Sequence, residues 1–180
     1  MTLGGPRLQG PTVVCLQNAT IILTPMSTTT GHGFERLERA TAGLQRHGTL
    51  QRLHEHVAAQ AGVDCERAVY LVLRRVAGEG PMRVTEVARD LGVEPSTASR
   101  HLQCLETKGW VTRLADPEDR RAALVAATPA GEDAVRKVET ERRAVLAGAL
   151  KDWEPADRER LFDLTERFYA DLSEYVLQLA

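Results

Sequence analysis

Aromatic residues and cysteine are scarce in this sequence. Phe, Trp and Tyr make up 4% of the 180 residues, so Leu, Val and Ala must fill a core of the kind found in helical proteins. Cys15, Cys65 and Cys104 lie far apart, without a CxxC or Cys/His spacing, which argues against a disulfide framework and against a zinc site. This cysteine usage suits a reducing cytoplasm, and we expect no metal and no cofactor.

A long apolar run is also missing. No segment approaches the roughly 20 consecutive apolar residues that a membrane-spanning helix needs. The nearest candidate, TVVCLQNATIILT at 12–24, is interrupted by Gln17, Asn18 and Thr20 and lacks a clear cleavage pattern. We therefore interpret residues 1–30 as an N-terminal extension that is poorly ordered or lies upstream of the natural start, for which Met26 is a candidate.

Neither sign of charge is in excess. The 23 basic and 25 acidic residues give a formal net charge of -2, so any binding of nucleic acid must arise from a local arrangement of charge. The sequence also contains no Gly-rich phosphate loop, no nucleophile motif and no metal-binding cluster. We therefore expect that the protein is not an enzyme.

Apolar residues that recur at helical spacing predict a mainly α protein. Between Phe34 and Ala61 the pattern fits either one long helix or two helices broken at Gly48. A helix for which Asp64 is a plausible N-cap follows. Two further helices cover the chain after Thr128.

The segment 82–128 combines two short helices with a hairpin. Thr85 can cap a helix that Gly92 closes, and Pro95 starts a second helix that ends at Gly109. The runs WVTRL and AALVAAT then predict two short strands. Two helices separated by a glycine turn and followed by a hairpin are the parts of a winged helix-turn-helix.

The second of these helices carries the side chains that a DNA-reading helix needs. Ala98, Leu102 and Leu105 fall on one side and are expected to pack inward. On the other side, short hydroxyl groups can bond phosphate, an arginine can read guanine and a glutamine can read adenine. An ordinary solvated helix face is the alternative. The predicted DNA-binding residues here are Ser96, Thr97, Ser99, Arg100, His101 and Gln103.

The connection between the two strands, LADPEDRRAAL at 114–124, gathers acids and arginines. An arginine at a hairpin tip can enter the narrow minor groove if a carboxylate holds it extended. Asp116 or Asp119 is placed to brace Arg120 or Arg121 in this way. The alternative is a turn whose exposed charges pair only with one another, which stabilises a protein by about 0 to 1 kcal/mol.

The stretch LGVEPSTASRHLQCLETKGWVTRLADPEDRRAALVAATPAGEDAV resembles the MarR family of winged-helix transcription regulators. The match rests on STASRHLQCLETKGWV, on the wing motif DPEDRR and on the TPAG that opens the next helix. The resemblance implies a DNA-binding domain at 63–128. It also implies that the helices at 31–62 and 129–180 form the interface of a homodimer.

The resemblance further implies how such a dimer would bind double-stranded DNA. Each recognition helix, 95–108, would enter a major groove, and each wing would reach a minor groove through Arg120 or Arg121. Arg121, braced by Asp119, is our preference. The operator should be a pseudo-palindrome because a two-fold dimer reads two half-sites, and repression is the expected outcome.

Members of this family commonly respond to small phenolic or aromatic compounds, or to oxidation. A ligand would lie in the crevice between the dimer helices and the winged domain, where His54, Val57, Tyr70 and Arg74 are candidate lining residues. Cys65 is the redox candidate, because the dipole of the helix that it begins could lower the pKa of its thiol. A packed, inert thiol is the alternative.

Two other functions remain open at this point. One is a protein-interaction module that kept the winged fold but lost DNA binding, which the equal numbers of acids and bases in 81–125 favour. The other is a regulator that senses oxidation through a cysteine. The exposed arginine on the predicted recognition helix, together with the wing, argues for DNA binding over the first.

Overall fold

The computed structural model describes residues 14–16, 19–21, 28–45, 48–117, 119 and 123–179. They fall into two compact units, residues 1–50 and 51–180. The first unit contains an antiparallel pair of short strands, β1 (Val14–Leu16) and β2 (Ala19–Ile21), and the helix α1 (Thr28–Gln45). Both strands lie within residues 1–30, the segment that the sequence analysis interprets as an N-terminal extension.

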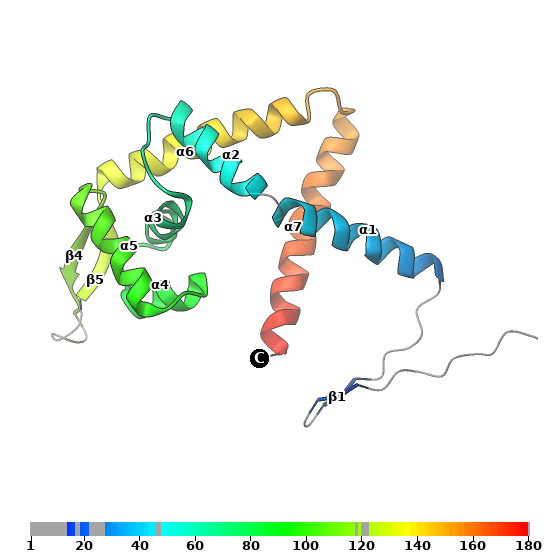
Figure 1. The fold of residues 1–180 in the computed structure, drawn as a ribbon, viewed down its shortest axis with the longest axis horizontal. Helices are drawn as coiled ribbons and strands as arrows, with labels where there is room; N and C mark the ends of the chain where they lie inside the picture. Colours follow the sequence, from blue (N-terminus) through cyan, green and yellow to red (C-terminus); the bar gives the residue numbers. More distant parts are fainter. Residues whose placement is uncertain are drawn as a thin grey trace, which may run out of the picture. The chain divides into compact units, whose positions relative to one another are not determined.

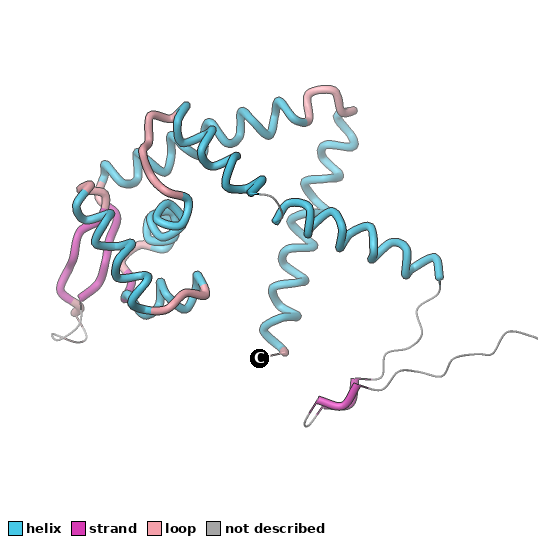
Figure 2. The backbone as a smooth tube through the Cα atoms, viewed as in Figure 1, coloured by secondary structure: helices cyan, strands magenta, loops and turns pink. Residues whose placement is uncertain are grey.

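The second unit contains the winged helix-turn-helix that the sequence predicts, followed along the chain by two long helices (Figure 1). Its three strands form one antiparallel sheet in the order β3-β5-β4, and Figure 2 shows the two longer strands standing out as a hairpin. The predicted mainly α fold is confirmed. The elements are α2 (Thr49–Gln60), which starts in the last residues of the first unit, α3 (Arg67–Glu79), β3 (Met82–Arg83), α4 (Val84–Leu91), α5 (Pro95–Thr107), β4 (Val111–Ala115), β5 (Ala123–Ala127), α6 (Pro129–Ala149) and α7 (Pro155–Gln178).

Glycines punctuate the helices where the sequence indicated. Gly48 has a φ of 66° and separates α1 from α2, so the first apolar pattern is a pair of helices and not one long helix. Gly92 and Gly109 adopt φ values of 63° and 71°, the left-handed region that a side chain disfavours. These two residues close α4 and α5 as predicted.

The two predicted helix starts that rested on N-caps are wrong. Thr85 lies inside α4, whose N-cap is Arg83, and Asp64 lies outside α3, whose N-cap is Glu66. In α4 the carboxylate of Glu86 accepts the backbone N–H of Arg83 at 2.7 Å, and this bond satisfies one of the donors at the helix start. The cap therefore comes from within the helix and not from a hydroxyl before it.

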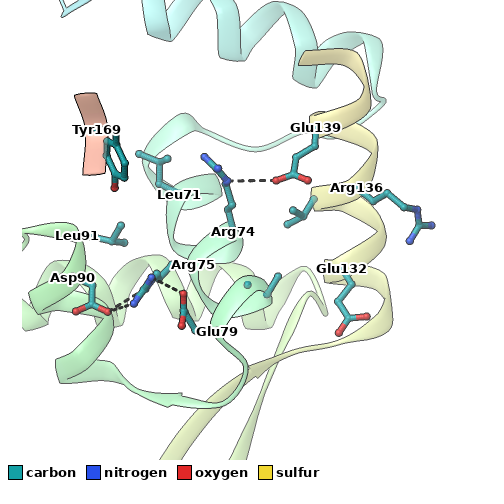
Figure 3. A pocket seen from close by; sticks show the side chains of 13 residues that line it. Leu71, Arg74, Arg75, Glu79, Asp90, Leu91, Glu132, Arg136, Glu139 and Tyr169 are labelled. Atoms are coloured by element: carbon teal, nitrogen blue, oxygen red, sulfur yellow. Dashed lines mark hydrogen bonds and ion pairs between the residues drawn. The ribbon is translucent and has the colours of Figure 1, made fainter. Parts of the chain in front are cut away.

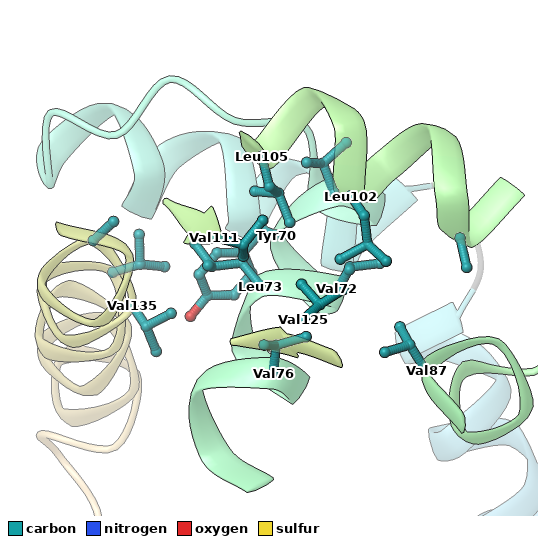
Figure 4. Close-up of a cluster of buried hydrophobic side chains, with 14 of the residues drawn as sticks. Tyr70, Val72, Leu73, Val76, Val87, Leu102, Leu105, Val111, Val125 and Val135 are labelled. Carbon is teal, nitrogen blue, oxygen red and sulfur yellow. The ribbon is translucent and has the colours of Figure 1, made fainter. Parts of the chain in front are cut away.

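Helix α3 forms the centre of the hydrophobic core. Tyr70, Leu73 and Val76 are fully buried, and Figure 4 shows side chains of α4, α5, β5 and α6 arranged around them. Burying each such side chain is worth about 1.5 to 3 kcal/mol. On the α5 side, Leu102 and Leu105 are fully buried, so the inward face of α5 is the predicted one. This packing fixes which face of α5 is left for a partner.

Two helices carry apolar side chains that the described part of the chain does not cover. No residue of α7 is buried, and Phe34 and Leu44 of α1 are both 57% exposed. None of the described helices is long and apolar enough to cross a membrane. The exposed large apolar residues of α7 are Leu161, Phe162, Leu164, Phe168, Tyr169, Leu172, Tyr175, Val176 and Leu177.

The start of α6 approaches the backbone of the wing so closely that only glycine fits. Thr128 caps α6 by accepting the N–H of Gly131 at 3.2 Å, and it donates its hydroxyl to the carbonyl of Gly109 at 2.7 Å. A Cβ at Gly131 would lie 2.1 Å from the carbonyl oxygen of Trp110, and that oxygen also accepts the backbone N–H of Thr128 at 3.0 Å.

We expect Gly131→Ala to lower the free energy of unfolding by about 1 to 3 kcal/mol, because the new methyl group must displace backbone. Urea denaturation followed by circular dichroism measures the change. Gly148→Ala, in the same helix but with nothing within 4 Å of its Cβ, is the matched control. It should be neutral or stabilise by up to about 1 kcal/mol. Equal stability of the two variants would contradict the close approach.

Candidate nucleic-acid interface

The outward face of α5 presents the polar residues that the sequence selected. Ala98, Leu102 and Leu105 point into the core, which turns the opposite side of the helix to solvent. The structure thus brings the six predicted residues of this helix onto one accessible surface. Ser96, Ser99, Arg100 and Gln103 are exposed, and Thr97 and His101 are partly exposed.

The start of α5 lacks a side-chain cap. Pro95 occupies the first turn, and the N-cap residue Glu94 makes no side-chain hydrogen bond to the helix. A helix start carries partial positive charge and outward N–H groups, which suit a phosphate oxygen. The hydroxyl groups of Ser96 and Thr97 lie in this same turn.

Several acids around α5 and α4 are paired with arginines of the same domain. Glu106 lies 2.5 Å from Arg113 on β4, and Asp90 lies 2.6 Å from Arg75 on α3. The hydrogen bond from Arg75 lowers the pKa of Asp90 below its usual value. Arg100 has no ion pair within the residues that the structure describes. These acids are therefore held by partners inside the domain, while Arg100 stays available on the α5 surface.

The wing is a regular antiparallel hairpin up to its last strand pair. The register runs from Val111 opposite Ala127 to Ala115 opposite Ala123. Arg120 and Arg121 lie outside the described residues, so their contacts and any bracing by Asp119 stay a prediction.

Asp116, the first residue beyond the strand, has a partner that the sequence did not reveal. Its side chain is 4% exposed, and its Oδ2 accepts a hydrogen bond from Nε of Arg83 at 2.7 Å and lies 2.6 Å from Nη2 of the same guanidinium. Its Oδ1 accepts the backbone N–H of Asp119 at 3.3 Å, a bond that caps the turn after β4. Arg83 precedes Asp116 by 33 residues, so no local pattern could have joined them.

The four predicted effector residues do not line one cavity together. His54, Val57 and Tyr70 are buried in the core, where the rings of His54 and Tyr70 lie 5.0 Å apart and His54 Nε2 lies 2.8 Å from the carbonyl oxygen of Cys65. Arg74 alone lines a cavity of about 650 Å³. His54, Val57 and Tyr70 are therefore core residues and not part of a ligand site.

The cavity that contains Arg74 opens between helices of the winged domain and the long C-terminal helices (Figure 3). Arg74 lies 3.5 Å from Glu139 on α6, while Arg75 bonds both Glu79, at 2.9 Å, and Asp90. Leu71 and Leu91 add apolar wall, and so does Tyr169 from α7. The lining thus combines three arginines and four carboxylates with aromatic and aliphatic side chains.

Cys65 lacks the activation that the sequence suggested. It lies before Glu66, the N-cap of α3, and so outside the first helical turn. Burial raises the pKa of its thiol to about 11, opposite in direction to the expected effect of the helix dipole. At neutral pH this thiol is protonated, and a protonated thiol is a poor nucleophile. In the described part of the chain, no group of three or more His, Cys, Asp or Glu side chains could hold a metal ion.

The comparison with known proteins agrees with the geometry. The MarR family model matches residues 66–123. The chain is 33% identical over 104 residues to the uncharacterized HTH-type transcriptional regulator YxaD of Bacillus subtilis, covering 58% of this chain and 73% of that protein. It is also 33% identical over 69 residues to the multiple antibiotic resistance protein MarR of Salmonella typhimurium, covering 38% of this chain and 48% of that protein.

Solved structures share the fold over most of the chain. A MarR family protein from Bacillus stearothermophilus has a TM-score of 0.68 at 18% identity, covering 82% of this chain and 99% of that one. RV1404 from Mycobacterium tuberculosis has a TM-score of 0.65 at 28% identity, covering 76% of this chain and 94% of that one. With the winged helix-turn-helix and its polar α5 surface, these matches establish that the chain belongs to the MarR family of transcription regulators.

Proposed function

We propose that this protein is a homodimeric repressor that binds a pseudo-palindromic operator and is released from it by a small aromatic ligand. The observation that carries the DNA-binding part is the outward face of α5, where exposed hydroxyl, guanidinium and amide groups stand beside a hairpin wing. The likeness to DNA-binding regulators in the family supports the same function. A winged fold that had turned to protein partners would have no use for base-reading side chains on this helix.

Each side chain of the α5 surface has a role in this proposal. Arg100 reads guanine through its two-pronged guanidinium, and Gln103 reads adenine. Ser96, Thr97 and Ser99 bond phosphates at the helix start, and His101 flanks them. The wing reaches the neighbouring minor groove through Arg120 or Arg121, with Arg121 preferred.

We expect Arg100→Ala to weaken specific DNA binding by about 1 to 3 kcal/mol and to relax base preference at one position of each half-site. Fluorescence anisotropy against the DNA upstream of the protein's own gene, with a scrambled competitor and at two salt concentrations, measures both effects. Lys151→Ala is the control, because Lys151 is exposed in the turn that follows α6, outside the winged helix-turn-helix.

If Arg100→Ala weakens binding to specific and scrambled DNA equally, Arg100 contacts a phosphate and does not read a base. Should the wild type bind neither this DNA nor any fragment in a genome-wide selection, the protein-interaction alternative would replace the proposal. Binding of a specific fragment should weaken as salt increases, because the protein displaces counterions from phosphates.

The partner that we propose for α1 and α7 is a second copy of this chain. Leu164, Phe168, Leu172 and Tyr175 follow one another at helical spacing along α7 and are all exposed. A monomer rarely leaves so continuous an apolar face in contact with water. The solved relatives are matched over nearly their whole length, and a homodimer is what the resemblance to the MarR family implies.

We expect the wild type to sediment as a dimer and Leu164→Glu to shift it toward monomer, because a carboxylate would be buried without a partner. Sedimentation velocity at several concentrations measures the change. Thr165→Glu places the same charge one residue away on the same exposed helix and should leave the dimer intact. A monomeric wild type, or equal effects of both variants, would contradict this interface. DNA affinity should fall with the dimer, since two half-sites would no longer be read together.

The ligand that we propose occupies the cavity at Arg74. The guanidinium there has one acidic partner, Glu139, at 3.5 Å, in an ion pair that is about half exposed and therefore weak. A carboxylate on an aromatic ring could replace that partner while the ring lies against Leu71 and Tyr169. Binding here would act on α3 and α4, which support the recognition helix.

We expect the phenolic acid salicylate to raise the Tm of the wild type and to raise that of Arg74→Ala much less. At ten times its Kd a ligand stabilises the folded state by about 1.4 kcal/mol. Differential scanning fluorimetry measures the shift. Arg52→Ala is the control, because Arg52 is exposed on α2 and is not among the residues that line the cavity. An equal shift in all three proteins, or none in the wild type, would rule out this site for such ligands.

A further inference from the structure

Arg83 joins three elements of the winged domain. Arg83 is one of the two residues of strand β3 and pairs with Leu124 of β5. Its backbone N–H donates to Glu86 in α4 at 2.7 Å, and its guanidinium binds Asp116 at the end of β4. One residue thus contacts the first helix of the helix-turn-helix and both strands of the wing.

We propose that Arg83 is a positioning residue that sets the direction of the wing relative to the recognition helix. This inference rests on the proposed DNA binding, because it says how the two DNA-reading parts of one protomer keep a fixed geometry. Arg83 itself need not touch DNA. We call the Arg83–Asp116 pair, together with the bond from the Asp119 N–H, the wing clamp.

The wing clamp acts where the strand pairing stops. Ala115 and Ala123 are the last paired residues of β4 and β5, and Asp116 follows directly. Both oxygens of its carboxylate are engaged, Oδ2 by the guanidinium and Oδ1 by the N–H of Asp119 three residues on. Arg83 is thereby linked, through the side chain of Asp116, to the backbone of Asp119 in the connection between the two strands.

Burial makes the wing clamp hard to replace. The Asp116 side chain is 4% exposed, and a carboxylate in that setting needs a charged partner close by. Asp116 raises the pKa of Arg83 through a hydrogen bond and its negative charge, so the guanidinium stays charged at any physiological pH. Apart from the Arg83 side chain, β3 is joined to the wing by two residue pairs, Met82 with Val125 and Arg83 with Leu124.

A purely electrostatic role for the pair predicts the opposite of a positioning role. Asp116→Asn removes a negative charge from the DNA-binding domain, so electrostatics alone would tighten binding to phosphates. If the pair positions the wing, the same variant weakens binding, because the amide is a poorer partner for the guanidinium. Asp116→Asn therefore separates the two explanations.

The experiment compares Arg83→Met, Arg83→Lys and Asp116→Asn with the wild type. Arg75→Met is the matched control, because Arg75 also binds one carboxylate oxygen, of Asp90, through Nε at 3.1 Å and Nη2 at 2.6 Å but has no contact with the wing. The DNA is the fragment that the wild type selects from genomic DNA. Affinity is measured by anisotropy, and hydroxyl-radical footprinting reports protection in the minor groove.

We expect Arg83→Met and Asp116→Asn to lose affinity by roughly tenfold, because a wing that is not held in place must be ordered on binding. Arg83→Lys should be intermediate, and Arg75→Met should stay within about twofold of the wild type. Minor-groove protection should fade in the clamp variants while major-groove contacts persist. Wild-type affinity, or tighter binding, in folded Asp116→Asn would overturn the proposal.

A second measurement needs no DNA. Amide hydrogen exchange should be faster in β4 and β5 of Arg83→Met than in the wild type, with α3 and α6 unchanged, whereas Arg75→Met should leave β4 and β5 alone. Unchanged exchange in the wing would overturn the clamp even if the protein binds DNA. Faster exchange in a protein that binds no DNA would uphold the clamp and reject the proposed function.

Discussion

The burial of α3 in the centre of the winged domain is the constraint on which the rest of the structure depends. Tyr70, Leu73 and Val76 have no exposed surface, and four other elements pack against them. Because Leu102 and Leu105 must lie on this cluster, α5 has only one orientation about its own axis. The polar face of α5 is exposed to solvent because the opposite, apolar face is buried in the core.

Pairing of charges within the domain gives that outer face its character. Three of the seven acids in 81–125 are paired with arginines of neighbouring elements, namely Asp90, Glu106 and Asp116. A count of charges treats every group as equally available to a phosphate. The folded domain does not, because a carboxylate held at 2.6 Å by a guanidinium repels a distant anion far less than an isolated one.

Predictions at single residues succeeded or failed according to the range of the interaction behind them. Gly92 and Gly109 were correctly placed because a left-handed backbone conformation is a property of one residue. Thr85 and Asp64 were each misplaced as caps by two residues, and α4 starts where Glu86 accepts the backbone N–H of Arg83 and not at a hydroxyl. The expected activation of Cys65 failed because this residue precedes the first turn of α3 and because burial raises the pKa of its thiol. His54, Val57 and Tyr70 likewise belong to the core, which helical spacing alone does not distinguish from a cavity wall.

The sequence by itself determined the order of the helices and of the two longer wing strands, the turn between α4 and α5 and the polar face of α5. Periodicity, glycine conformation and side-chain chemistry are all local, so they can be recognised without knowing the fold. Only the tertiary structure decided that β3 joins the sheet, that Asp116 binds Arg83 and that Arg74 lines a cavity. Those contacts join residues far apart in the chain, and they exist because the packing around α3 brings their backbones together.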